Sequence, residues 1–133
     1  MSMRGPFAAI VAAAVLSGVS LAAHHSFGGT YNVDRQITLK GTIVQLTLRS
    51  PHSFVYIEVT DEGGAAQRWT IEGASAQQFA QQGFDKDAFK VGDPVEIVGN
   101  PSRSPNSTRA RLIKITRTTD GRTWGSRAGE VVN

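Results

Sequence analysis

The sequence has no cysteine among its 133 residues, which excludes disulfides, thiolate metal ligands and a cysteine nucleophile. It also lacks a strong excess of one charge, since 14 Lys and Arg stand against 11 Asp and Glu, a net charge of +3. A balance this small does not argue for a nucleic-acid partner. Catalytic patterns such as HExxH, a phosphate-binding loop or a nucleophile elbow are missing too. We therefore expect neither nucleic-acid binding nor enzyme activity.

The one marked apolar run lies near the N-terminus and is short. Arg4 precedes the apolar stretch Phe7–Leu16, and small residues follow it. This order is typical of a secretory signal peptide, and the run is too short to cross a bilayer comfortably. We predict a cleaved signal over 1–23, with cleavage after Ala22 or Ala23, a periplasmic or secreted location, and no stable membrane span after processing. A retained membrane anchor is the alternative.

Stretches rich in Val, Ile and Thr dominate the rest of the chain and favour strands over long helices. Apolar and polar residues alternate over Gln36–Arg49, and the alternation slips at Val44, after which Val44, Leu46 and Leu48 carry the apolar phase. A slip by one residue predicts a β-bulge within one long, curved strand.

A capping box of Ser75 and Gln78 predicts one helix, and Gly83 is placed to end it. We therefore expect one domain over 24–124, all-β with one short helix, in a small OB-like five-stranded barrel (β-β-β-α-β-β). A different small barrel, or a sandwich with a helical plug, is the alternative. The predicted segments are an irregular lead-in (26–35), strands at Gln36–Arg49, Ser53–Thr60, Gln67–Glu72, Pro94–Gly99 and Arg109–Arg117, a return at Arg122–Trp124 after a two-residue Asp120-Gly121 turn, and a flexible tail (125–133).

Five short motifs follow one another along the predicted mature chain. They are His24-His25-Ser26-Phe27, Ser50-Pro51-His52, Trp69-Thr70-Ile71-Glu72, Gly92-Asp93 and Asp120-Gly121-Arg122. On these motifs the chain resembles a family of small exported bacterial proteins that is catalogued only as a domain of unknown function. Its members begin the mature region with His-His-Ser-Phe and carry Asn-Pro-His after the first strand, so Ser50 departs from the usual asparagine. The resemblance implies a periplasmic location and a β-rich fold, and it implies no activity.

The three histidines of the chain are candidate metal ligands. His24 and His25 stand at the predicted mature N-terminus, and His52 stands between the first two strands. Imidazole nitrogens suit copper, zinc and nickel, and a free terminal amine adds a ligand. A chain that starts at His24 would chelate copper through its amine and ring, with His52 as a third nitrogen. A chain that starts at Ala23 would bind Cu(II) or Ni(II) through its amine, two amides and the His25 ring.

The alternative is that these histidines have no metal role. His24 and His25 would then be polar residues on a flexible terminus, and His52 would cap a turn or hydrogen-bond a backbone carbonyl. Two functions therefore stay open. One is a periplasmic binding or accessory module that presents loops to an unknown protein or small ligand. The other is a protein that binds copper or another transition metal through the mature N-terminus and His52, with an oxidoreductase as a distant third.

Two further groups of side chains leave two interpretations each. The strand aromatics would either stack a ligand or, more often, fill the core; they are Phe54, Tyr56, Trp69 and Trp124. Three arginines near the polar loop 100–108 would either meet an anionic partner or form a solvated basic edge that discourages strand pairing; they are Arg103, Arg109 and Arg111.

Overall fold

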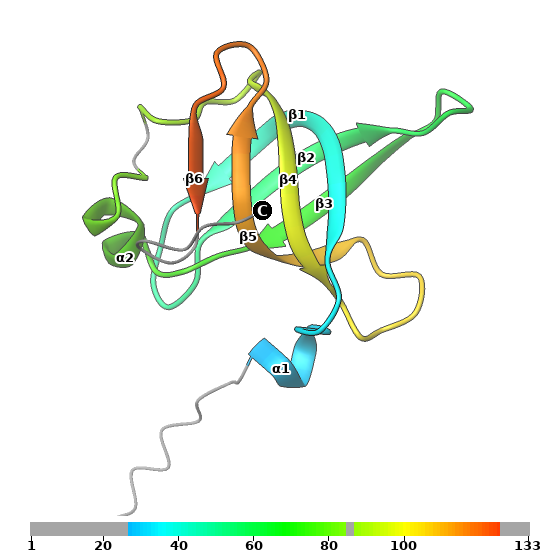
Figure 1. Cartoon of the computed structure of the whole chain (residues 1–133), viewed down its shortest axis with the longest axis horizontal. Coiled ribbons are helices and arrows are strands. Elements are labelled where there is room, and N and C mark those ends of the chain that lie inside the picture. The colour runs from blue at the N-terminus through cyan, green and yellow to red at the C-terminus, as the bar shows by residue number, and fades with distance from the viewer. Residues whose placement is uncertain (1–26, 85–86, 126–133) are drawn as a thin grey trace, which may run out of the picture.

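The strands of this chain form one sheet that closes on itself (Figure 1). The structure, a computed structural model, describes residues 27–84 and 87–125. Neighbouring strands follow the order β3-β2-β1-β4-β5-β6, and a parallel pairing of β3 with β5 closes the first five into a barrel. The predicted OB-like fold is thereby confirmed. The elements are α1 (Phe27–Thr30), β1 (Ile37–Thr47), β2 (Phe54–Thr60), β3 (Ala66–Glu72), α2 (Ala76–Gln81), β4 (Pro94–Pro101), β5 (Arg109–Arg117) and β6 (Thr123–Gly125).

Strand β1 serves both halves of the barrel because it bends. Residues 37–42 pair with β4, and residues 42–47 pair with β2. The register with β2 shifts between Ile43 and Gln45, so the predicted bulge is confirmed. Val44 is 36% exposed, and its assignment to the inward row is wrong, because a bulged residue leaves the pleat. Leu46 and Leu48 do pack against the core.

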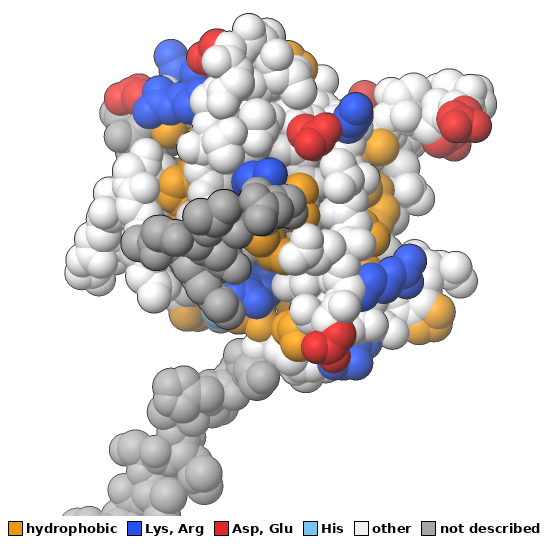
Figure 2. Space-filling model, in the orientation of Figure 1, with side chains coloured by type: hydrophobic (Ala, Val, Ile, Leu, Met, Phe, Trp, Pro, Cys, Tyr) orange, Lys and Arg blue, Asp and Glu red, His pale blue; other side chains and the backbone are white. Residues whose placement is uncertain are grey.

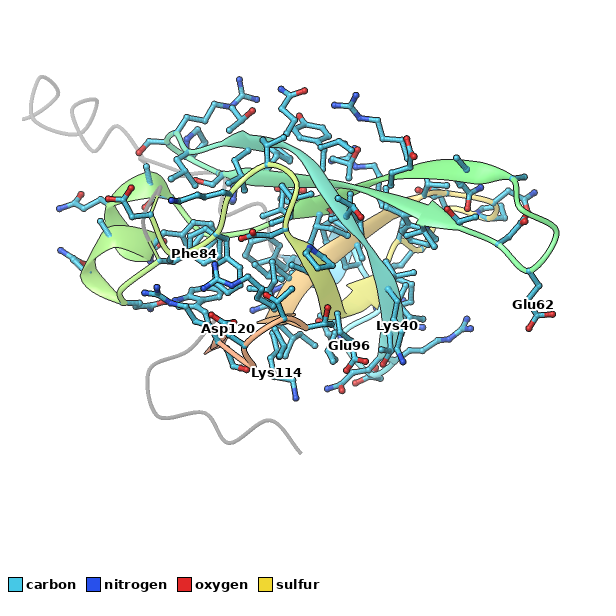
Figure 3. All side chains as sticks on the ribbon, turned by 90° about the horizontal axis from the view of Figure 1, so that it is seen from above. Lys40, Glu62, Phe84, Glu96, Lys114 and Asp120 are labelled. Atoms are coloured by element: carbon cyan, nitrogen blue, oxygen red, sulfur yellow. The ribbon has the colours of Figure 1, made fainter. Side chains whose placement is uncertain are left out.

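The core fills the barrel with aliphatic side chains and one end of it with aromatic rings. Ile43, Ile57 and Ile71 are fully buried among the strands. At the α2 end, the rings of Phe79 and Phe84 stack at 4.7 Å between centroids, and Figure 3 shows Phe84 at this end. At the opposite side β2 and β3 run on as a hairpin (Figure 1), and Figure 3 shows Glu62 at its tip.

Helix α2 forms where its capping signals predict it. The Ser75 hydroxyl accepts a hydrogen bond from the Gln78 amide, and the Gln78 side chain accepts one from the Ser75 amide. The helix ends at Gln81, two residues before Gly83, whose φ of 80° suits glycine. Phe79 is the buried residue of this helix.

The predicted lead-in is not irregular throughout, because α1 makes one helical turn within it. The Tyr31 amide donates to the carbonyl of Phe27 at 2.7 Å, and Tyr31 then forms an isolated bridge with Ser102. This bridge fixes the turn against the β4–β5 loop, and Tyr31 is only 1% exposed. The described part of the chain therefore has two short helices, where one was predicted. The tertiary contacts of Tyr31 stabilise a turn whose two glycines have low helix propensity.

The β5–β6 connection is not the predicted two-residue turn. It spans Thr118–Arg122, and the Gly121 amide donates to the carbonyl of Arg117 at 2.9 Å. The Asp120 carboxylate accepts from Arg117 at 2.7 and 3.0 Å and from the Arg122 amide at 3.1 Å. Because this carboxylate bonds to residues on both sides of the loop, it stabilises the longer connection over a two-residue turn.

The Arg117 contacts predict an acid dependence of stability. Hydrogen bonds from the Arg117 guanidinium hold the pKa of Asp120 at about 2, below its ordinary 3.8. A lowered folded-state pKa adds stability above the unfolded value, and this stability is lost as the pH falls through the folded value. We expect the unfolding midpoint to drop between pH 4 and 2, and to drop less in Arg117→Gln. Thermal unfolding across this range checks it, with Arg122→Gln as control; equal acid dependence in both variants would contradict it.

The predictions for the two chain ends lie outside the described residues. These are the signal peptide over 1–23, the ligands His24 and His25, and residues 126–133 of the predicted tail. Gly125, the first residue of the predicted tail, is instead the last residue of β6, where it pairs with Lys114. Within the described part of the chain, no helix is both long and apolar enough to cross a membrane.

Candidate binding site at the His52 end of the barrel

The β1–β2 loop that carries His52 is anchored to the segment between β3 and α2. Ser53 is fully buried, and its hydroxyl accepts from the Arg49 amide and donates to the Arg49 carbonyl at 3.1 and 3.2 Å. The Ser53 amide donates to the carbonyl of Ala74, and the Gly73 amide donates back to the carbonyl of Ser53, both at 2.8 Å. The loop therefore presents His52 from a fixed backbone.

One ring nitrogen of His52 is occupied within the fold. Nδ1 lies 3.3 Å from the carbonyl oxygen of Gly73 and 3.6 Å from Oε1 of Glu72. The hydrogen bond to a backbone carbonyl, which was expected for a histidine without a metal role, is therefore present. Nε2 has no hydrogen-bond partner among the described residues. A histidine whose Nδ1 is oriented by a carbonyl or carboxylate is also the arrangement that metal-binding histidines use.

Glu72, at the end of β3, connects three elements at this end of the barrel. Its Oε2 accepts a hydrogen bond from the Tyr31 hydroxyl and lies 3.3 Å from a terminal nitrogen of Arg109. Burial, followed by the hydrogen bond to Glu72, raises the pKa of the Tyr31 hydroxyl. Glu72 belongs to the Trp69–Glu72 motif, but no role for its side chain was predicted from the sequence. The link through one carboxylate between β3, β5 and Tyr31, which directly follows α1, was not predicted.

Phe27 joins α1 to His52. Its ring meets the His52 ring edge-on with the centroids 5.4 Å apart. The guanidinium carbon of Arg111 lies 4.6 Å from the centroid of the same phenyl ring, within the range of a cation–π contact. Phe27 therefore packs between an imidazole and a guanidinium, and α1 is held beside the β1–β2 loop.

Two cavities meet at Pro51 and His52. The first, of about 170 Å³, is lined by these residues together with Phe27, Gly73, Ala74, Gln78, Arg111 and Leu112. The second, of about 270 Å³, is lined by them with Arg49, Ser50 and Phe54. The two cavities bring together residues from α1, the β1–β2 loop, the β3–α2 segment and β5. Each is smaller than the roughly 300 Å³ at which typical ligand pockets begin.

The predicted metal site stays a prediction. Only His52 of the three histidines lies within the described residues. In that part of the chain no three side chains of His, Asp or Glu come together to hold a metal ion. His52 and Glu72 do approach each other, with Nδ1 and Oε1 3.6 Å apart. A complete ligand set would therefore need at least one ligand from outside the described residues.

The strand aromatics divide between core and surface. Trp124 belongs to the core, as expected, and Trp69 packs against it. Phe54 and Tyr56 are half-buried and lie under arginines, Arg49 at 5.3 Å and Arg68 at 4.7 Å from the respective ring centroids.

The interpretation of the three arginines near the polar loop as a solvated edge is wrong for two of them. β5 has β4 on one side, and β3 and β6 along the other, so it is not an edge strand. Arg109 pairs with Glu72, and Arg111 packs on Phe27. On the face shown in Figure 2, Lys and Arg side chains are spread over several places and interspersed with Asp and Glu. This face has no single large basic patch.

A family model described as "Family of unknown function (DUF6152)" matches residues 11–111. The chain belongs to this family. The match to DUF6152 confirms the expected resemblance to an uncharacterised family. It includes His52, Glu72 and the histidines before Phe27, and it stops short of the Asp120-Gly121-Arg122 motif. That DUF6152 members share the His-His-Ser-Phe start remains a prediction.

None of the curated proteins matches this DUF6152 chain. Among solved structures, the mitochondrial single-stranded DNA binding protein Rim1 of S. cerevisiae has a TM-score of 0.48 and 13% identity, over 63% of this chain and 93% of the other. The OB-like assignment rests on the strand order and pairing of the chain itself, above all on the parallel β3–β5 pair.

Proposed function

We propose that this protein is an exported, periplasmic binding or accessory module, not an enzyme, and that its ligand or partner contacts the His52 end of the barrel. The observation that carries the proposal is the pair of cavities that share Pro51 and His52. Loops held by a closed barrel are suitable binding elements, because the scaffold fixes them while their surfaces stay accessible. The small size of each cavity favours a small ligand or a protruding group of a partner protein.

Export is supported by the first 23 residues. A basic residue, an apolar run and small residues stand there in the order that signal peptidase substrates have. The absence of cysteine is compatible with an oxidising compartment. The periplasm would also keep the domain away from cytoplasmic nucleic acid.

A second candidate is a copper-binding protein that uses the mature N-terminus and His52. Two observations favour it. Nδ1 of His52 is already oriented by Gly73 and Glu72, which leaves Nε2 for a metal. Phe27 contacts the His52 ring, and with consecutive Cα atoms about 3.8 Å apart, the Cα of His25 lies at most about 8 Å from that of Phe27. Copper, when bound, would accept imidazole and amine nitrogens; the chain would supply His24 or His25, the terminal amine and His52.

Native mass spectrometry of protein recovered from the periplasm tests both candidates. We expect a chain that starts at Ala23 or His24 and carries a bound small molecule, partner or metal. His52→Ala should lose this adduct, while Gln77→Ala, an exposed change on α2, should keep it. A full-length chain found in the cytosol would overturn export, and a small-molecule or protein adduct that survives in His52→Ala would overturn the assigned binding site.

Added Cu(II) separates the two candidates in the same experiment. If the metal candidate is correct, the processed protein binds one copper, and a residue added before the natural first residue abolishes this binding. Loss in His52→Ala indicates the site that begins at His24, and loss only in His25→Ala indicates the site that begins at Ala23. No binding to the processed protein contradicts the copper candidate and leaves the binding module standing.

A further inference from the structure

A third cavity lies away from His52, where the β4–β5 loop faces the segment that follows α1. Its volume is about 370 Å³, larger than either cavity beside His52 and within the range of small-molecule sites. Polar and basic side chains dominate its lining, and no Asp or Glu takes part; they include Arg35, Arg103, Ser102, Ser104, Asn106 and Ser107.

A buried asparagine fixes the two walls of this cavity. Asn100 is 2% exposed, and its side-chain amide donates to the carbonyls of Arg35 at 2.8 Å and Val33 at 3.3 Å. The Asn32 amide donates to the carbonyl of Pro101 at 2.9 Å. These bonds hold the segment after α1 against the start of the β4–β5 loop. The backbone on both sides of the cavity is therefore fixed by the fold.

The two guanidinium groups in the lining have no carboxylate partner among the described residues. The ion pairs there join other side chains. The Nε of Arg103 donates to the carbonyl of Gly28 at 2.8 Å. This contact orients the guanidinium and leaves its two terminal nitrogens for a ligand. The Ser102 hydroxyl oxygen accepts from the Ser104 amide at 3.1 Å, so its own proton stays available to a ligand.

We propose that this cavity binds a phosphate or sulfate group, carried by a small organic molecule. The planar fork of arginine matches two oxygens of such a group. The hydroxyls of Ser102, Ser104 and Ser107 can donate to the other oxygens of a phosphate or sulfate group. A carboxylate ligand has only two oxygens and would leave these donors unused. The volume of about 370 Å³ leaves room for a ring beside the anion, and the open, polar lining suits a sugar. This site is separate from the one in the proposed function.

The test is a titration of the processed protein with inorganic phosphate, glucose 6-phosphate and acetate, followed by amide chemical shifts at constant ionic strength. We expect saturable shifts at the residues of the β4–β5 loop with both phosphates, and weaker shifts with acetate. Arg35→Gln should weaken phosphate binding about tenfold or more, because one charge-assisted fork is lost. Arg68→Gln, which removes an arginine on the outer face of β3, should leave the affinity unchanged.

Each outcome decides the proposal. Tighter binding of glucose 6-phosphate than of phosphate supports the proposal, and equal binding would overturn the organic carrier. No saturable shift with either phosphate, an equal response to acetate, or an equal loss in Arg68→Gln would overturn it. His52→Ala serves as a second control, since it should abolish the function proposed above without changing phosphate affinity.

Discussion

Phe79→Ala is expected to lower the free energy of unfolding by about 3–5 kcal/mol. The Phe79 side chain is fully buried and is the buried residue of α2. It stacks on Phe84 and meets Trp124 edge-on, each at 4.7 Å between centroids. Because both neighbouring rings are held by other parts of the fold, the space left by the missing ring cannot collapse fully.

Gly73 adds to this cost. A Cβ atom at Gly73 would lie 2.2 Å from the tip of the Phe79 ring, so the backbone after β3 lies directly against the phenyl group. Removing the ring therefore exposes backbone as well as side chains to a void. The same segment carries the carbonyl that contacts His52, which connects the aromatic end of the core to the candidate site.

Urea unfolding measures the Phe79→Ala effect. Gln77→Ala, two residues before Phe79 on the exposed side of the same helix, should change stability by less than about 0.5 kcal/mol. Phe79→Leu, which keeps part of the apolar volume, should lie between the two. A loss below about 1 kcal/mol in Phe79→Ala would mean that α2 is not anchored through this ring.

Glu72→Ala is expected to cost about 2–3 kcal/mol, because it removes the acceptor that Tyr31 and Arg109 share. The Tyr31 residue is 1% exposed, so its hydroxyl loses its partner without gaining full access to water. A buried donor left without an acceptor costs about 1–3 kcal/mol. The Arg109 guanidinium is about half exposed, so its ion pair adds little.

A double-mutant cycle isolates the Tyr31 contribution. Tyr31→Phe removes the hydroxyl, and in that background Glu72→Ala should cost at least about 1 kcal/mol less than in the unmodified chain. Strictly additive effects would contradict the link between α1 and β3. Glu58→Ala, an exposed glutamate on β2, controls for the removal of one negative charge.

The Glu72 variant also bears on the candidate site. Residues that orient a metal-binding histidine typically change metal affinity 10- to 100-fold when they are replaced. If the copper candidate is correct, Glu72→Ala should therefore weaken copper binding in addition to stability, whereas Tyr31→Phe should affect stability alone.

Local signals in the sequence determined most of the secondary structure. The slip in alternation at Val44 marked the bulge, because one extra residue in a period of two is visible in sequence alone. The Ser75–Gln78 capping box marked the start of α2, because its hydrogen bonds join residues only three apart in the sequence. Arg109–Arg117 was predicted as a strand with the bounds that β5 has.

Tertiary structure alone decided the features that depend on distant partners. The turn at α1 exists because Tyr31 pairs with Ser102, and the Asp120 loop exists because Arg117 reaches its carboxylate. The candidate site is of the same kind. Tyr31 and Glu72 are 41 residues apart, and Glu72 and Arg109 are 37 apart. Their meeting requires the parallel closure of β3 on β5, which no local pattern encodes because its energy comes from pairing segments that are distant along the chain.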